Sequence, residues 1–160
     1  MTGAVSAALV AQLLVAVSGY TGYAIPGDLP TVVRVPHAAL EAMACGRPCA
    51  VLGFAAPDGT IALDDTLHLG ADAADTSILV HELTHVLQRA AAGGAPAADC
   101  AAWLEREREA YDVQYRWLQD TAPNIRELSL RLVRLGTHPL IPPCRPGEGV
   151  RQETSGMAPK

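Results

Sequence analysis

The stretch ILVHELTHVLQRAA, residues 78–91, is the segment that most strongly indicates how this chain folds. Its residues are apolar nearly all the way round a helical projection, and this predicts a helix that is buried on most of its surface. The preceding segment, residues 71–77, supplies Asp and Thr side chains that can cap the start of a helix, and Gly93 and Gly94 end it. We therefore expect a central helix in the interior of the domain.

Two histidines four residues apart lie on this helix, with a glutamate directly after the first. Residues i and i+4 share one helix face, so His81 and His85 can each aim a ring nitrogen at one point. Glu82 lies about 100° further round the helix, where it can act on a water molecule without binding the metal. Two core histidines satisfied by hydrogen bonds alone would be costly among such apolar neighbours. The pattern predicts a zinc site with His81 and His85 as ligands and Glu82 as catalytic base.

A catalytic zinc ion needs a third protein ligand, and residues 103–118 offer three glutamates for it. In a helical projection of this segment, Glu107 falls near the middle of the apolar arc, while Glu105 and Glu109 lie on the solvated face. A lone glutamate on an apolar face predicts a buried carboxylate with a specific role. We expect Glu107 to be the third ligand, with Glu109 as the alternative. Gln114 shares the inward face and could orient a ligand.

With these residues in place, the chain resembles the gluzincin metallopeptidases, which carry HExxH on one helix and a glutamate ligand on the next. EREAY, residues 107–111, is similar to the ExEA element in which such families place their ligand at the first acidic position, here Glu107. The small size and element order resemble the minimal members called minigluzincins, and also bacterial families of uncharacterised peptidases. The resemblance covers residues 30–120. It departs from larger gluzincins in having Tyr111 where they have a second-shell Asp, which leaves the partner of His81 open.

The resemblance implies a zinc-dependent peptidase acting on a peptide or protein substrate, with Glu82 moving a proton from water to the leaving nitrogen. It also implies that the strand at residues 60–65 presents an edge to an extended substrate. Tyr111 is a candidate for stabilising the oxyanion, and Tyr115, His68 and His138 are further candidates. The alternative function is a zinc-binding interaction module without peptidase activity. A structural protein with an accidental motif would require the motif and the phase of Glu107 to coincide.

The remaining patterns predict an α+β domain whose small antiparallel sheet lies between helices. We expect a first helix at residues 4–18, and the β-branched segment 31–35 predicts a strand before a short helix at 37–44. Two further strands are expected at 49–55 and 60–65, joined by a hairpin turn at Asp58-Gly59. After the buried helix we expect helices at 98–120 and 124–136. The minimal zincin-like domain then spans residues 1–136, and residues 137–160 form a Pro-rich tail.

Composition excludes several classes of protein. Of the 160 residues 49% are hydrophobic, as expected for a globular chain, and the net charge of −5 with 4% aromatic residues argues against a nucleic-acid or anionic-membrane partner. The apolar segment 4–17 is shorter than the roughly 20 residues that a membrane-spanning helix needs. It also lacks the basic start of a signal peptide, so we expect an amphipathic helix of the mature domain rather than a span.

The chain has an even number of cysteines, Cys45, Cys49, Cys100 and Cys144. Four cysteines allow three pairings, and the CGRPC turn could bring the sulfurs of Cys45 and Cys49 together. Two disulfides would favour an oxidising compartment, secreted or periplasmic, over the cytoplasm, where free buried thiols are the alternative.

Overall fold

The helix that carries the two histidines is α3, Ala73–Ala91, and the computed structural model describes residues 5–123 around it. The other helices in this part of the chain are α1 (Ala7–Thr21), α2 (His37–Ala44) and α4 (Cys100–Thr121). Both long helices begin at an aspartate whose side chain accepts a backbone hydrogen bond: Asp72 from the N–H of Asp75 at 2.9 Å, and Asp99 from the N–H of Ala102 at 2.8 Å. The predicted cap and the buried central helix are confirmed.

The three strands are β1 (Val32–Val35), β2 (Gly53–Ala55) and β3 (Ile61–Asp64), and their order across the sheet is β1-β3-β2. The hairpin between β2 and β3 is antiparallel, as the Asp-Gly turn predicts. β1, however, runs parallel to β3, so the sheet is mixed and the expectation of an antiparallel sheet is wrong. α2 connects β1 to β2, which runs opposite to β1, and the β2–β3 hairpin reverses the chain once more, so that β3 returns parallel to β1 between the two.

The strand order also corrects the prediction about the substrate edge. β3, which contains most of residues 60–65, is the central strand and pairs on both sides. It therefore has no open edge for another chain. The edge strand of the hairpin is β2, and β2 also contacts α3.

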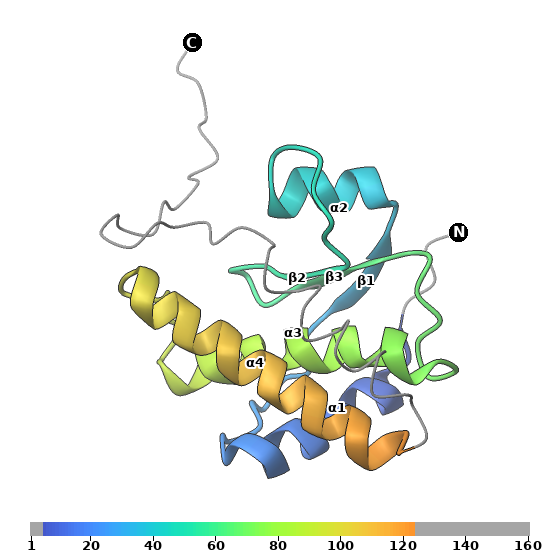
Figure 1. Ribbon diagram of the computed structural model, residues 1–160. Coiled ribbons are helices and arrows are strands. Elements are labelled where there is room, and N and C mark those ends of the chain that lie inside the picture. Colours follow the sequence, from blue (N-terminus) through green and yellow to red (C-terminus); the bar gives the residue numbers. More distant parts are fainter. Residues whose placement is uncertain (1–4, 124–160) are drawn as a thin grey trace.

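The sheet separates two layers of helices (Figure 1). α2 lies on one face of the sheet, and α3 lies on the other with α1 and α4 beyond it. α3 contacts α1, α4, β2 and β3, so it is covered on several sides, as its apolar residues require. This architecture confirms the α+β class: an N-terminal helix, a small sheet, and two long helices packed together.

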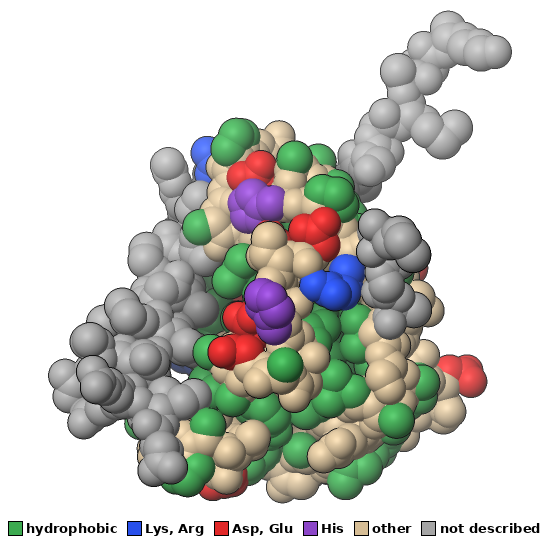
Figure 2. Space-filling model, turned by 90° about the vertical axis from the view of Figure 1, so that its right-hand side faces the viewer, with side chains coloured by type: hydrophobic (Ala, Val, Ile, Leu, Met, Phe, Trp, Pro, Cys, Tyr) green, Lys and Arg blue, Asp and Glu red, His purple; other side chains and the backbone are tan. Residues whose placement is uncertain are grey.

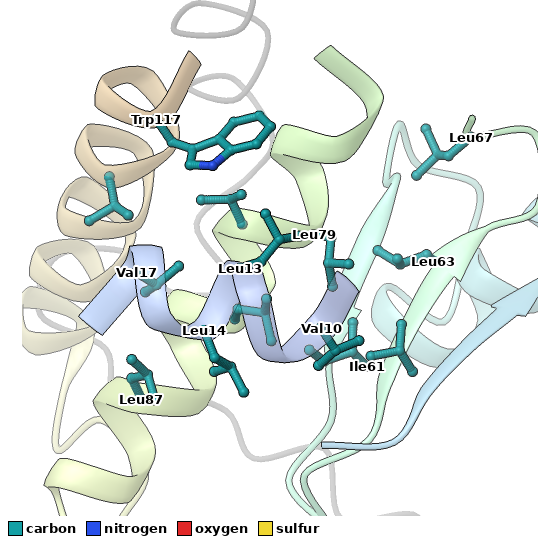
Figure 3. Packing of buried hydrophobic residues seen from close by; sticks show 14 of the residues in the cluster. Val10, Leu13, Leu14, Val17, Ile61, Leu63, Leu67, Leu79, Leu87 and Trp117 are labelled. Atoms are coloured by element: carbon teal, nitrogen blue, oxygen red, sulfur yellow. The ribbon is translucent and has the colours of Figure 1, made fainter. Parts of the chain in front are cut away.

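The core lies where α1, α3, α4 and β3 meet (Figure 3). Leu13 and Leu14 of α1, Leu63 of β3, Leu79 of α3 and Trp117 of α4 point into it. Each of these side chains is at least nine-tenths buried. This packing fixes α3 against α4, and the candidate site depends on that contact.

Two further predictions concern the chain ends and the cysteines. Cys45 and Cys49 form a disulfide with their Cα atoms 6.5 Å apart, and none of the cysteines that the structure describes is free. Within residues 5–123 no helix is both long and apolar enough to cross a membrane. The predicted helix at 124–136, the tail at 137–160 and their boundary lie outside the described residues.

Candidate metal centre

Three side chains from the two long helices converge on one point: His81 and His85 of α3 and Glu107 of α4. We call them the metal group. The two Nε2 atoms lie 3.1 Å apart, and Nε2 of His85 lies 3.1 Å from Oε1 of Glu107. Nε2 of His81 lies 3.5 Å from Oε2 of the same carboxylate. The i,i+4 spacing aligns the histidines, and the packing of α4 on α3 supplies the glutamate.

The metal group fits a zinc ion in both chemistry and spacing. Two atoms that each lie about 2.0–2.1 Å from one zinc ion at a tetrahedral angle are about 3.3 Å apart, close to the separations found here. Two imidazoles and one carboxylate form a ligand set of catalytic zinc sites, which keep a fourth position open. Within residues 5–123 this is the one cluster of three or more His, Cys, Asp or Glu side chains with such spacing. The group can therefore hold a metal ion.

The two histidines of the metal group lower the pKa of Glu107. Burial opposes its ionisation, but hydrogen bonds and charge from His81 and His85 outweigh burial and hold the pKa of Glu107 well below its ordinary range. Burial likewise disfavours a charged His85, yet the hydrogen bond and charge of Glu107 raise the pKa of His85 to about 9. The two histidines thus favour the ionised carboxylate of Glu107, the form in which it can bind a cation.

The second ring nitrogen of each histidine has a different environment. Nδ1 of His85 lies 2.9 Å from Oε1 of Gln88, one turn along α3. Nδ1 of His81 is buried without a hydrogen-bond partner, and its ring packs against Tyr111 with the ring centroids 4.3 Å apart. Tyr111 therefore touches a predicted ligand through its ring. Only His85 has a polar group holding its Nδ1.

Gln114, expected to orient a ligand, is fully buried in α4. Its Nε2 donates a hydrogen bond to Oγ of Ser77 at 2.9 Å, and its Oε1 has no partner. Ser77 precedes His81 by one helical turn. The amide thus lies beside the N-terminal side of the site, without a hydrogen bond to the metal group.

Glu82 reaches from α3 to the edge strand of the sheet. It is 7% exposed, and the backbone N–H of Ala55 in β2 lies near enough to its carboxylate to favour the charged form. Gly53 lies directly against it, because a Cβ atom there would be 2.7 Å from Oε1 of Glu82. Burial raises the pKa of Glu82, while the charges of His81 and His85 act in the opposite direction. A buried carboxyl with a raised pKa, next to a possible metal, is well suited to accept a proton.

The other glutamates of α4 lie elsewhere. Glu105 is exposed and pairs with Arg108 at 3.2 Å, as its solvated phase predicts. Glu109 is not part of the metal group; its Oε2 accepts hydrogen bonds from Nε2 of Gln88 at 2.9 Å and from the hydroxyl of Tyr23 at 3.0 Å. Glu109 is thus connected to His85 by hydrogen bonds through a single residue, Gln88.

The remaining candidates for oxyanion stabilisation do not belong to the metal group. Figure 2 shows histidine side chains beside acidic ones on one face of the molecule. His68 is exposed, and its Nδ1 lies 3.3 Å from Oδ2 of Asp75. The hydroxyl of Tyr115 accepts a hydrogen bond from Gln119 at 3.1 Å. His138 lies outside the described residues.

Sequence reasoning missed Gln88 and Gly53. A signal for Gln88 was present, since it follows His85 by three residues and therefore lies beside it on the same helix face. Gly53 carried a weaker signal, because a glycine within a strand often marks the close approach of another group. The metal group itself matches a zinc site of the type that combines HExxH with a glutamate. Neither a protein-family model nor a curated protein nor a solved structure matches this chain.

Proposed function

We propose that this protein is a zinc-dependent peptidase in which His81, His85 and Glu107 hold the metal and Glu82 is the catalytic base. The observation that carries the proposal is the convergence of the three ligand atoms, all within 4.8 Å of one another, with the carboxylate of Glu82 beside them. An interaction module would need the ligands alone. The buried base next to them favours an enzyme.

The chemistry that this site supports is hydrolysis of an amide. A zinc ion bound there would polarise the scissile carbonyl and lower the pKa of a water molecule. Glu82 accepts the proton of the attacking water and delivers it to the leaving nitrogen, a task for which a buried carboxyl of raised pKa is suited. The carboxylate lies against Gly53 of β2, beside the edge strand of the sheet.

Among residues 5–123, β2 pairs with a strand on one side only, and its other edge is the surface we assign to an extended peptide. Leu52 and Ala56, on either side of this strand, direct their backbone hydrogen bonds toward β3. Because these groups alternate along a strand, Gly53 and Ala55 direct theirs away from β3. Main-chain pairing at this edge would align the scissile bond with the site and demand little of the substrate's side chains.

Two measurements test the proposal. The first is zinc per chain, by elemental analysis, of the purified wild type; we expect about one ion. The second is cleavage of a mixed peptide library, followed by mass spectrometry, with wild type, Glu82→Gln and the exposed control Glu105→Gln. We expect cleavage by wild type and by the control, and loss of cleavage with zinc retained in Glu82→Gln.

Other results would contradict the proposal in distinct ways. A wild-type protein that takes up no zinc when zinc is supplied would remove the metal site and the peptidase together. Stoichiometric zinc with no cleavage of any peptide would leave the zinc-binding interaction module as the function. Undiminished cleavage by Glu82→Gln would assign the base to another residue.

A further inference from the structure

A chain of hydrogen bonds leads from His85 to the segment that follows α1. It passes from Nδ1 of His85 to Gln88, from Gln88 to Glu109, and from Glu109 to the hydroxyl of Tyr23, with separations of 2.9, 2.9 and 3.0 Å. We infer that Gln88, Glu109 and Tyr23 are positioning residues for the metal ligand His85. Zinc affinity therefore depends on Tyr23, although two residues, Gln88 and Glu109, stand between it and His85 in this series of hydrogen bonds. The inference rests on the metal site of the proposed function.

The first step is the orientation of the Gln88 amide. Its Nε2 lies 2.8 Å from the backbone oxygen of Arg106 and 2.9 Å from Oε2 of Glu109. Both of these oxygens can only accept hydrogen bonds, so the amide nitrogen must face them. Oε1 then faces His85, whose Nδ1 must donate its hydrogen. In the neutral ring, the form that binds a metal ion, Nε2 of His85 then has its lone pair directed at the metal group.

The second step is the anchoring of Glu109. Its Oε2 receives two hydrogen bonds, from α3 through Gln88 and from the α1 side through Tyr23. The backbone of Tyr23 is itself fixed, since its carbonyl accepts a hydrogen bond from Oγ of Ser18 at 2.6 Å and its N–H donates to Oγ1 of Thr21 at 3.2 Å. The phenol hydroxyl is thus held at a defined place by the end of α1.

The third step is the effect on His85. Gln88 is 5% exposed, so its hydrogen bonds are shielded from competing water. Donation by its amide to a carboxylate polarises the amide and makes Oε1 a stronger acceptor for the N–H of His85. A stronger acceptor raises the basicity of the opposite ring nitrogen and fixes the ring plane, and losing such a partner lowers metal affinity by roughly 10- to 100-fold.

Tyr20 offers a matched control. Tyr20 lies in α1, three residues before Tyr23, and it also donates a hydrogen bond from its hydroxyl to a carboxylate of α4, that of Asp120. Within residues 5–123 no recorded hydrogen bond leads from Asp120 to the metal group. Removing either hydroxyl deletes one hydrogen bond to α4, and only the Tyr23 bond leads to His85. Glu109 variants alone are less informative, because they would also test Glu109 as a direct ligand.

The experiment measures the zinc dissociation constant of the full chain by competition with a chromophoric chelator at fixed pH. The proteins are wild type, Gln88→Ala, Tyr23→Phe and Tyr20→Phe, and the melting temperature of each metal-free protein is recorded beside the affinity. We expect a 10- to 100-fold weaker affinity for Gln88→Ala, a loss of roughly 3- to 10-fold for Tyr23→Phe, and no change for Tyr20→Phe.

The outcomes separate this inference from the proposed function. If wild type binds zinc and neither Gln88→Ala nor Tyr23→Phe weakens it, the inference is wrong while the peptidase can stand. Equal losses for Tyr20→Phe and Tyr23→Phe would also overturn it, because they would indicate a general loosening of α1 on α4. The expected affinities with no peptide cleavage would support the inference and reject the peptidase. A wild type that binds no zinc overturns both.

Discussion

Gly53 of β2 and Glu82 of α3 are in contact so close that a Cβ atom on the glycine would stand 2.7 Å from Oε1 and 2.8 Å from Cγ of the glutamate. The backbone of Gly53 is not in the left-handed region that favours glycine. Glycine is therefore suited to this position because its missing side chain leaves room for Glu82, and not because of its backbone conformation. A hydrogen in place of a methyl group lets the carboxylate lie against the sheet edge.

Gly53→Ala is expected to push the Glu82 carboxylate away from the edge strand while the metal group stays intact. General-base catalysis contributes roughly 10²- to 10⁴-fold, and we expect a partial loss, roughly 10- to 100-fold in kcat. Zinc content and kcat are measured on the same preparations. Gly27→Ala is the control, since a Cβ there meets nothing within 4 Å. Unchanged kcat in Gly53→Ala would show that the contact does not position the base.

Glu107→Ala is expected to lose zinc, because it leaves two imidazoles where three ligands are needed. Glu105→Ala, on the exposed face of the same helix, should keep it. Zinc at about 100 times its dissociation constant stabilises a native state by about 2.7 kcal/mol. A chelator should therefore lower the melting temperature of the wild type and of Glu105→Ala, and leave that of Glu107→Ala unchanged. Zinc retention by Glu107→Ala would move the third ligand to another residue, with Glu109 the first to test.

The contact between His37 and Asp64 predicts a pH-dependent stability. Nδ1 of His37 lies 2.6 Å from Oδ2 of Asp64, and Nε2 lies 3.3 Å from Glu41. The hydrogen bond to Asp64 raises the pKa of His37 above its ordinary 6.5. Burial opposes ionisation of Asp64, but hydrogen bonds from Thr66 and His37 outweigh it and lower the pKa of Asp64 below 3.8.

The signs of these shifts fix the pH window. The contribution of His37 is fully present below pH 6.5 and is lost as the pH rises through the raised pKa; that of Asp64 is present above pH 3.8 and is lost as the pH falls through the lowered pKa. The free energy of unfolding of wild type minus that of His37→Phe should thus be larger at about pH 5 than at about pH 9. Denaturant titrations at both values measure it. An equal difference at both pH values would show that the ion pair does not contribute.

Leu83→Ala tests the packing that holds the metal group. Leu83 lies between the two histidines in sequence and is fully buried in the core. Truncation of a buried leucine costs about 2–5 kcal/mol, because the lost contacts leave a cavity. The free energy of unfolding of metal-free protein should fall by that amount, and Leu52→Ala, 42% exposed in wild type, should change it by less than about 1 kcal/mol. A small effect for Leu83 would mean that the core closes around the cavity.

Much of the fold follows from local patterns. The central helix was predictable because capping side chains in residues 71–77 precede a long apolar segment, and Asp72 is the residue that caps it. The hairpin was predictable because Asp58-Gly59 suits a tight turn. The parallel pairing of β1 with β3 was not, because it depends on the path of the chain through α2. Hydrophobic alternation within a strand carries no information on the direction of its neighbour.

The sequence by itself determined the ligand spacing of the candidate site. His81 and His85 share a helix face through their i,i+4 separation, and Glu107 is the glutamate of α4 that faces inward, both consequences of a fixed helical period. Only the tertiary structure decided that β2 and not β3 is the edge strand beside Glu82 in the described part of the chain, and that Gln88, Glu109 and Tyr23 are hydrogen-bonded in a row behind His85. These contacts link segments far apart in the chain, so they are set by the packing of α1, α4 and the sheet around α3, which no local period encodes.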